Sequence, residues 1–295
     1  MTAPCLWSEP ERAAAQSLID LALFEDLGPN GDVTTNALIG RGEIGTVAIV
    51  ARESGVLAGL PVARMVFESV DSDVTFDALI EDGASLEPGS VVARLTGRVP
   101  SLLTGERAAL NFLTHLSGVA SLTRRYVKLV DGTKASIFDT RKTLPGWRLL
   151  EKYAVRAGGG RNHRVGLYDM VLIKDNHLAA WHAARPEATV AGAVLAARAH
   201  AGTAVPVEVE VDTLLQLEDA LVGRPDFVLL DNMTCDQLRE AVAIRDAAAP
   251  EVKLEASGGV NLATVGEIAR TGVERISVGA LTHSAVALDL AFDWS

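Results

Sequence analysis

The stretch DTRKTLPGWRLLEKYAVRAGGGRNHRVGLYDMVLIKDNH covers residues 139–177 and sets the expectation for the fold. A β-prone run, 136–140, leads into it, and a helix is predicted over 147–157. The glycines of 158–160 end that helix, and a second β-prone run, 168–173, lies near the end of the stretch. Strand and helix alternate here, as they do in parallel α/β sheets.

The same alternation continues toward the C-terminus. Further strands are predicted at 205–211, 226–230, 252–256 and 275–278, and further helices at 187–201, 213–222, 234–248 and 262–271. The fold class of this part is therefore α/β with a parallel sheet. Six strands can be counted, and the pattern leaves open whether the sheet is open or closed into a barrel.

The first part of the chain has a different pattern. Helices are predicted at 9–26, 61–70 and 101–130, short strands at 46–50, 55–58 and 90–94, and a polar turn region at 26–35. Separate strands and helices predict an α+β module. Ser117-Gly118 is a candidate break in the longest helix.

The opening stretch is basic, although the protein has a formal net charge of -11. Between residues 141 and 164 a single acidic residue, Glu151, stands against the cations Arg141, Lys142, Arg148, Lys152, Arg156, Arg161 and Arg164. A basic island in an acidic protein favours a small polyanionic ligand over nucleic acid. A solvated charged face is the open alternative.

Length and composition limit the kind of protein that the chain can form. With 295 residues, 48% of them hydrophobic, the chain can form two domains or one large barrel. No apolar run approaches the roughly 20 residues that span a bilayer, and no signal pattern opens the chain. Cys5 and Cys235 are isolated, which argues against a disulfide framework or a thiolate metal cluster. We therefore expect a cytoplasmic protein with no membrane or nucleic-acid partner.

Almost every predicted strand ends at charged or glycine-rich residues. In a parallel α/β barrel, functional residues gather at the C-terminal ends of the strands. The residues at these ends are Arg141 and Lys142, Lys174, Glu208 and Glu210, Asp231, Ser257-Gly258-Gly259, and Gly279-Ala280. A barrel that served only as a scaffold would not need them, so we expect a site at this edge.

Several motifs resemble one known family. They are EDLGPNGDVTT at 25–35, GERAALNFLTHLSGVAS at 105–121, the opening stretch, VEVEV at 207–211, LLDN at 229–232, EASGGV at 255–260 and SVGALTHS at 277–284. Over almost the whole chain, they closely resemble the quinolinate phosphoribosyltransferase family. The resemblance implies an N-terminal α+β sandwich domain over 1–115, to which 284–295 return, and a seven-stranded parallel α/β barrel over 116–283.

The resemblance also implies a reaction. The family transfers the phosphoribosyl group of phosphoribosyl pyrophosphate to quinolinate, and it yields nicotinate mononucleotide, pyrophosphate and CO2 in de novo NAD biosynthesis. The catalytic residues implied are Lys142, Glu210 and Asp231. The substrate-binding residues implied are Arg107, Thr140, Arg141, Lys142, His163, Arg164, Lys174, Glu210, Asp231, Ser257, Gly258, Gly259, Gly279 and Ala280.

The carboxylates of VEVEV lie on one face of their strand, because side chains alternate with a period of two. Buried carboxylates are costly unless a cation or metal balances them. For Glu208 a structural ion pair remains an open alternative. Glu210, nearer the strand end, and Asp231 are expected to bind Mg2+ together with the substrate phosphates, since Mg2+ takes few oxygen ligands from protein.

Two glycine turns are candidates for binding phosphate. Ser257-Gly258-Gly259 follows one strand and precedes a predicted helix, and Gly279-Ala280 follows the last strand. Glycine lets backbone N–H groups approach a phosphate, and phosphate sites recur on the last strands of barrels. The chain contains no GxxxxGK[ST] P-loop pattern.

Of the histidines, His163 is expected to act, because Arg164 and glycines flank it. His115, His182 and His200 are expected to have no chemical role, and His177 and His283 to brace site loops. Arg107 is implied by the resemblance to reach the site of a neighbouring subunit, so a homodimer is expected. A surface pair with Glu106 is the alternative for Arg107.

Two other functions are weighed. One is a related phosphoribosyltransferase that uses another aromatic acid, such as nicotinate, or a molybdenum-system paralogue of unknown substrate. A carrier module is suggested by GASLEPGSVVARLTG at 83–97, which resembles the hairpin of biotinyl or lipoyl domains. Such domains modify a lysine at the hairpin tip, and this segment has none.

Overall fold

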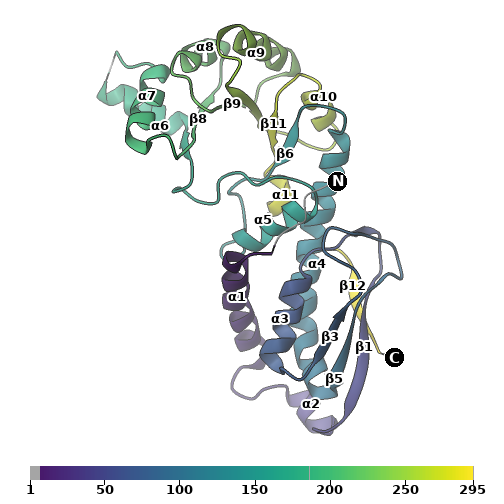
Figure 1. Ribbon diagram of the computed structural model, residues 1–295. Coiled ribbons are helices and arrows are strands. Elements are labelled where there is room, and N and C mark those ends of the chain that lie inside the picture. Colours follow the sequence, from purple (N-terminus) through teal and green to yellow (C-terminus); the bar gives the residue numbers. More distant parts are fainter. Residues whose placement is uncertain (1–6, 186, 295) are drawn as a thin grey trace. The chain divides into compact units, whose positions relative to one another are not determined.

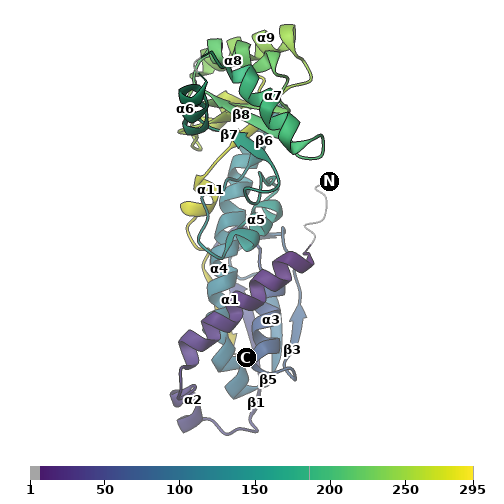
Figure 2. The ribbon, with the colours of Figure 1, turned by 90° about the vertical axis from the view of Figure 1, so that its left-hand side faces the viewer.

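The computed structural model describes residues 7–185 and 187–294, and these form two compact units (Figures 1 and 2). The first unit draws on Met1–Arg124, Lys142–Gly160 and Leu281–Ser295. The second draws on Arg125–Arg141 and Arg161–Ala280. No helix among the described residues is long and apolar enough to cross a membrane.

The first unit is built on an antiparallel sheet. Its elements are α1 (Glu9–Leu27), α2 (Val33–Leu38), β1 (Ile44–Ala51), β2 (Gly55–Val56), α3 (Leu60–Val70), β3 (Thr75–Ala78), β4 (Ser85–Leu86), β5 (Val91–Arg98), α4 (Val99–Leu129), α5 (Arg148–Ala157), α11 (Ala280–His283) and β12 (Leu290–Trp294). The sheet has the order β12-β1-β5-β3, so the last strand pairs with the first. The rings of Phe67, Phe76 and Phe292 cluster between α3 and this sheet.

The long helix α4 runs through Ser117-Gly118 without a break, so the candidate break was wrong. The Ser117 hydroxyl accepts from the Ala58 N–H at 3.0 Å and donates to the Ala58 carbonyl at 3.2 Å. A Cβ at position 118 would lie 2.2 Å from the Val286 carbonyl oxygen. The two small residues therefore admit neighbouring chain segments against the helix and do not end it.

The segment 83–97 does not form a hairpin of two paired arms. Strand β4 pairs with β2, whereas β5 pairs with β1 and β3. The predicted likeness to a carrier hairpin therefore does not extend to the strand pairing.

The second unit is built on a parallel sheet. Its elements are β6 (Ser136–Phe138), β7 (Val171–Ile173), α6 (Asp175–Ala184), α7 (Val190–Ala201), β8 (Val207–Val211), α8 (Leu214–Val222), β9 (Phe227–Asp231), α9 (Cys235–Ala248), β10 (Lys253–Ser257), α10 (Val265–Ala269) and β11 (Arg275–Ser277). The order is β6-β11-β10-β9-β8-β7, and every neighbouring pair is parallel. A parallel bridge joins Phe138 to Arg161 and adds a seventh extended position beside β6.

Local signals explain why the helices of this unit begin where they do. Helices α8 and α9 begin at capping boxes, in which Thr213 and Thr234 accept from the N–H groups of Gln216 and Gln237. Helix α6 was not predicted, because its N-cap is Lys174, which carries no capping signal in the sequence. In the first unit, the short helix α2 was predicted as part of a polar turn region. Its N-cap residue Asp32 accepts from the Thr35 N–H at 2.9 Å.

Candidate active site

The ends of the parallel strands bring most of the predicted site residues to one edge of the second unit. Thr140 and Arg141 follow β6, Lys174 follows β7, Glu210 and Asp231 lie near or at the ends of β8 and β9, and Ser257 to Gly259 and Gly279 to Ala280 follow β10 and β11. Because neighbouring strands run parallel, these ends share one edge of the sheet.

Lys174 and Glu210 form an ion pair at this edge. Their strands are adjacent, with Ile173 opposite Val209. The turn that carries Lys174 is fixed by its own N–H, which donates to Nδ1 of His177 at 2.9 Å. His177 therefore holds the Lys174 turn, as expected of a bracing residue.

Arg164 is buried, with 9% of its surface exposed, and its guanidinium donates to the Met170 carbonyl at 3.2 Å. Burial lowers the pKa of Arg164, and the positive charge of Arg141 lowers it further. The two guanidinium groups are thus close enough to repel each other. Such a pair favours an anionic ligand with two carboxylates.

Asp231 lies at the end of β9, beside the glycine turn that follows β10. The side-chain amide of Asn232 donates to Asp231 at 2.7 Å, and the backbone N–H of Asn232 donates to the Ser257 carbonyl at 2.9 Å. Gly258 has φ 91°, and a Cβ there would lie 2.2 Å from the Asn232 side chain. Glycine at 258 is therefore what lets the ends of β9 and β10 meet.

The turn after β10 precedes helix α10, as expected, but the helix begins at Val265 and not at residue 262. Asn261 first accepts from the N–H groups of Ala263 and Thr264. Gly279-Ala280 does stand before a helix, but α11 has only four residues.

His163 lies inside the second unit and is 8% exposed. Its Nε2 is 2.9 Å from a Glu208 oxygen and 3.4 Å from a Glu255 oxygen. The structural ion pair considered for Glu208 is therefore present. Both carboxylates are fully buried.

Sequence reasoning missed Glu255, Arg275 and Asp139. Glu255 forms an ion pair with Arg275, and Asp139 accepts from the Asn162 side chain and the His163 N–H. The signal for Glu255 and Arg275 was the one noted for VEVEV, namely a charge within a buried strand.

Arg107 and Lys142 belong to the first unit. Arg107 is exposed on α4, and Lys142 is exposed with its carbonyl accepting from the Thr282 hydroxyl at 2.7 Å. His115, expected to have no chemical role, contacts the buried Glu151 at 2.9 Å. The roles of Arg107 and Lys142 stay predictions.

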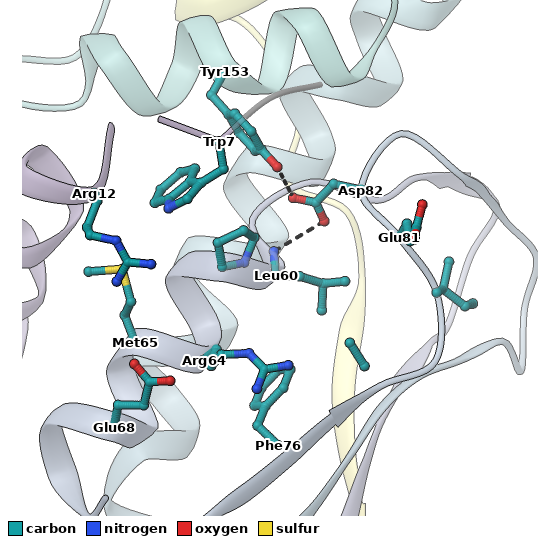
Figure 3. Close-up of a pocket in the computed structure, with 13 residues that line it drawn as sticks. Trp7, Arg12, Leu60, Arg64, Met65, Glu68, Phe76, Glu81, Asp82 and Tyr153 are labelled. Carbon is teal, nitrogen blue, oxygen red and sulfur yellow. Dashed lines mark hydrogen bonds between the residues drawn. The ribbon is translucent and has the colours of Figure 1, made fainter. Parts of the chain in front are cut away.

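A separate cavity of about 480 Å3 lies within the first unit (Figure 3). Asp82 at its wall accepts from the Tyr153 hydroxyl at 2.6 Å and from the N–H groups of Gly59 and Leu60. Arginines and carboxylates both line it, so no ligand charge is favoured, and it contains no predicted site residue.

Comparison with known proteins decides the family. Residues 119–293 match the model of the quinolinate phosphoribosyl transferase C-terminal domain, and residues 32–117 match that of the N-terminal domain. The chain belongs to the quinolinate phosphoribosyltransferase family.

Relatives agree over nearly full length. A nicotinate-nucleotide pyrophosphorylase (carboxylating) of Mycobacterium leprae is 46% identical over 97% of this chain and 99% of its own. The crystal structure of NadC from Streptococcus pyogenes has a TM-score of 0.90 at 39% identity and covers 98% of this chain and 99% of that one. The nicotinate-nucleotide pyrophosphorylase from Francisella tularensis has a TM-score of 0.89 at 36% identity and covers 100% of both. The expected fold class, an α+β domain followed by an α/β barrel, is thereby confirmed.

Proposed function

We propose that the protein is a pentosyltransferase that converts quinolinate and phosphoribosyl pyrophosphate to nicotinate mononucleotide, pyrophosphate and CO2, a step of de novo NAD biosynthesis. The family membership supports the reaction class. The observation that carries the substrate is the pair of Arg141 and Arg164. Quinolinate has two adjacent carboxylates, and two neighbouring guanidinium groups can bind them through charge-assisted hydrogen bonds.

The second substrate is assigned to the other strand ends. The turns Ser257-Gly258-Gly259 and Gly279-Ala280 would bind phosphate oxygens through N–H groups, with the Ser257 hydroxyl as a further donor. Thr140 and Lys142 would lie between the two substrates. Lys174 would face a quinolinate carboxylate, and its pair with Glu210 would hold it in place until then.

Glu210 and Asp231 fit a magnesium ion bound mainly by substrate. Both are oxygen ligands at adjacent strand ends, and Mg2+ uses few protein carboxylates while keeping its waters. Bound there, Mg2+ would neutralise the charge of the departing pyrophosphate. The two carboxylates themselves would stabilise the positive charge that develops on the ribose carbon during transfer.

Decarboxylation needs no covalent nucleophile from the protein. Once the ribose is attached, the ring nitrogen is cationic. As the neighbouring carboxylate leaves as CO2, the electron pair of the broken bond stays on the ring carbon, where the adjacent positive charge stabilises it, and that carbon then takes a proton from water. The protein would contribute by holding that carboxylate with cations until transfer has occurred. The residues assigned to this are Arg141, Arg164 and Lys174.

We infer further that the working form is a homodimer with shared sites and a cytoplasmic location. Arg107 is exposed on α4, in the first unit, and is available to a partner chain. A two-fold interface would place it in the partner's site. The isolated cysteines support a reducing compartment.

Turnover tests the proposal. Purified protein with Mg2+ and phosphoribosyl pyrophosphate should form nicotinate mononucleotide from quinolinate and not from nicotinate, as resolved by chromatography. Equal or greater turnover of nicotinate would show that the protein is a related transferase for another aromatic acid.

The magnesium assignment has its own test. Asp231→Asn keeps the size of the side chain and removes its charge, so it should lower turnover and raise the Mg2+ concentration needed for half-maximal rate. Calorimetric binding of quinolinate should change little. An unchanged rate and magnesium dependence would make Asp231 structural.

A further inference from the structure

Residues 142–147, here called the 142–147 segment, form an exposed loop that side chains of the first unit hold along its length. Lys142, Leu144, Pro145 and Gly146 are all exposed, and Gly146 has φ 82°, a conformation that favours glycine. Exposed loops are ordinarily the more mobile parts of a fold. The 142–147 segment departs from this, because side chains of α4, α5 and α11 contact it (Figures 1 and 2).

The first two residues of the segment are tied to α11 and α5. The Lys142 carbonyl accepts from the hydroxyl of Thr282, a residue of α11 that is 2% exposed, at 2.7 Å. A hydrogen bond that is shielded from water in this way is stronger than one at the surface. Nε of Arg148, the first residue of α5, donates to the Thr143 hydroxyl at 3.0 Å. The start of the segment is therefore held by two separate helices.

Glu151 of α5 holds the middle of the segment. It is the single acidic residue among the cations between residues 141 and 164, and it is fully buried. One of its oxygens accepts from the Leu144 N–H at 3.2 Å, and the other lies 2.9 Å from Nε2 of His115 on α4. A buried carboxylate is costly unless partners compensate its charge, so these contacts are strongly favoured. Glu151 therefore links the segment to both α4 and α5.

Aromatic rings hold the far end of the segment. Trp147 stacks on Phe112 of α4 with 4.9 Å between the ring centres, and it lies edge-on to His115 at 5.0 Å. The Trp147 N–H donates to the Leu144 carbonyl at 3.1 Å and closes the turn between them. The segment is thus fixed at both ends and in the middle, which leaves the backbone of Lys142 little freedom.

We propose that Thr282 and Glu151 are positioning residues, which fix the 142–147 segment so that Lys142 meets the substrates during phosphoribosyl transfer. This rests on the proposed function, in which Lys142 lies between quinolinate and phosphoribosyl pyrophosphate. A lysine ammonium sits on a flexible four-carbon stem, so it can be placed accurately only if the backbone beneath it is fixed. Thr282 and Glu151 act on the reaction through Lys142 and not by touching a substrate.

A purely structural role is the competing explanation, and Thr282→Val distinguishes the two. Valine keeps the shape of the side chain and removes the donor to the Lys142 carbonyl. The kcat should fall threefold to tenfold, whereas the calorimetric affinity for quinolinate, which is assigned to other cations, should change less than twofold. Thr282→Ser restores the hydroxyl and should recover at least half of the wild-type kcat. A folded Thr282→Val with normal kcat and a lowered melting temperature would overturn the proposal.

Thr271→Val is the matched control. Thr271 is 6% exposed, and its hydroxyl donates to the Ile268 carbonyl at 2.7 Å, in a loop of the second unit that carries no proposed site residue. The variant removes the same kind of hydrogen bond at the same distance. Its kcat should stay within 1.5-fold of wild type. A loss of kcat equal to that of Thr282→Val would show that the effect is general and would refute the positioning role.

Two substitutions of Glu151 test the middle of the segment. Glu151→Gln keeps an oxygen that can accept from the Leu144 N–H, so it should retain at least a third of the wild-type kcat. Glu151→Leu leaves that N–H without its acceptor and should lower kcat at least tenfold. Equal kcat values for the two folded variants would remove Glu151 from the positioning role.

A double-mutant cycle tests whether Thr282 acts through Lys142. Lys142→Ala removes the side chain that is being positioned, so addition of Thr282→Val should lower its remaining rate less than twofold. Single-turnover assays with enzyme in excess measure such slow rates. If the two losses multiply, the Thr282 hydroxyl acts on a different group and the proposal fails.

Hydrogen exchange of the wild type keeps the test independent of turnover and of variant folding. Mass spectrometry of peptides that cover residues 142–147 should show the Leu144 and Trp147 N–H groups exchanging at least tenfold more slowly than in an unstructured chain. In Thr282→Val these peptides should exchange at least fivefold faster, while peptides of α9 stay unchanged. Unprotected exchange in wild type would refute the proposal even if the enzyme turns over as proposed. A protected segment in a wild type without turnover would instead refute the proposed function.

Discussion

Lys174 and Glu210 form an ion pair between the end of β7 and the neighbouring strand β8. The pair joins a cation proposed to bind quinolinate to a carboxylate proposed to act on the ribose. The ion pair therefore links the proposed quinolinate site to the proposed ribose site before any substrate binds. Loss of either charge should disturb the side chain that carries the other.

Arg141→Ala and Arg164→Ala should each weaken quinolinate binding strongly and leave the fold intact. Each removes a charge-assisted hydrogen bond worth roughly 1.5–3 kcal/mol, or about 10- to 150-fold in affinity. Calorimetric titration with quinolinate measures this. Arg239→Ala on α9, where Arg239 pairs with Asp236 at the surface, is the control and should bind normally. Wild-type affinity in either site variant would remove that arginine from the site.

Gly118→Ala should destabilise the first unit. The new Cβ would lie 2.2 Å from the Val286 carbonyl oxygen, which is backbone and can move only with the segment leading to β12. Overpacking of this kind costs about 1–3 kcal/mol, so the melting temperature should fall. Gly192→Ala in α7 is the matched control, since its Cβ would meet only the Thr189 hydroxyl at 3.5 Å. There the better helix propensity of alanine should leave stability equal or raise it by up to about 1 kcal/mol. Equal melting temperatures for the two variants would show that Gly118 and the Val286 carbonyl are not tightly packed.

Much of the second unit followed from the sequence, and the reason is local. Thr213 and Thr234 are N-cap residues that predict the helices after them, and apolar runs between turn residues predict the strands. Lys174 carries no such signal, so α6 was missed. Gly118 could not be interpreted from sequence either. It lies within a helix because the chain segment at Val286 packs against it and leaves no room for a side chain.

The sequence predicted which edge of the parallel sheet holds the candidate site, but not which side chains pair with one another there. The strand ends marked Arg141, Lys174, Glu210 and Asp231 without help from tertiary structure. Nothing in the sequence paired His163 with Glu255, since they lie 92 positions apart and meet only through the order of the strands. The buried ring of His163 meets the side chains of Glu208 and Glu255, and its predicted role in binding substrate stays a prediction.

Stability should depend on the proton that His163 binds. Burial lowers the pKa of His163, but contacts with Glu208 and Glu255 outweigh burial and raise the pKa to about 9, above the ordinary value near 6.5. A raised pKa means that the proton is bound more tightly in the folded state. The contribution is therefore complete below about pH 6.5 and is lost as pH rises through 9, a change on the order of 3 kcal/mol.

Urea unfolding of wild type and Glu208→Gln at pH 7, 8, 9 and 10 measures this dependence. Glutamine removes one of the two carboxylates that raise the pKa of His163, so the free energy of unfolding of wild type should fall relative to the variant across this range. Other alkaline groups titrate alike in both proteins and cancel in the difference. A constant difference would show that His163 does not lose a proton in this range.

Mixing inactive Arg107→Ala chains with inactive Lys174→Ala chains should restore activity if sites are shared between subunits. In a mixed dimer one site receives both changes and the other receives neither. With random exchange half of the dimers are mixed, so recovery should approach about a quarter of wild-type activity. Native mass spectrometry should confirm the mixed dimer. Background activity despite confirmed exchange would mean that Arg107 acts within its own chain.

The central claim is that quinolinate is decarboxylated at the site between the strand ends. The most direct measurement uses quinolinate labelled with 13C in the 2-carboxyl group, together with phosphoribosyl pyrophosphate and Mg2+. One labelled CO2 is expected for each nicotinate mononucleotide formed, and no CO2 is expected without phosphoribosyl pyrophosphate. Nucleotide formed without labelled CO2, or no nucleotide from quinolinate at all, would contradict it.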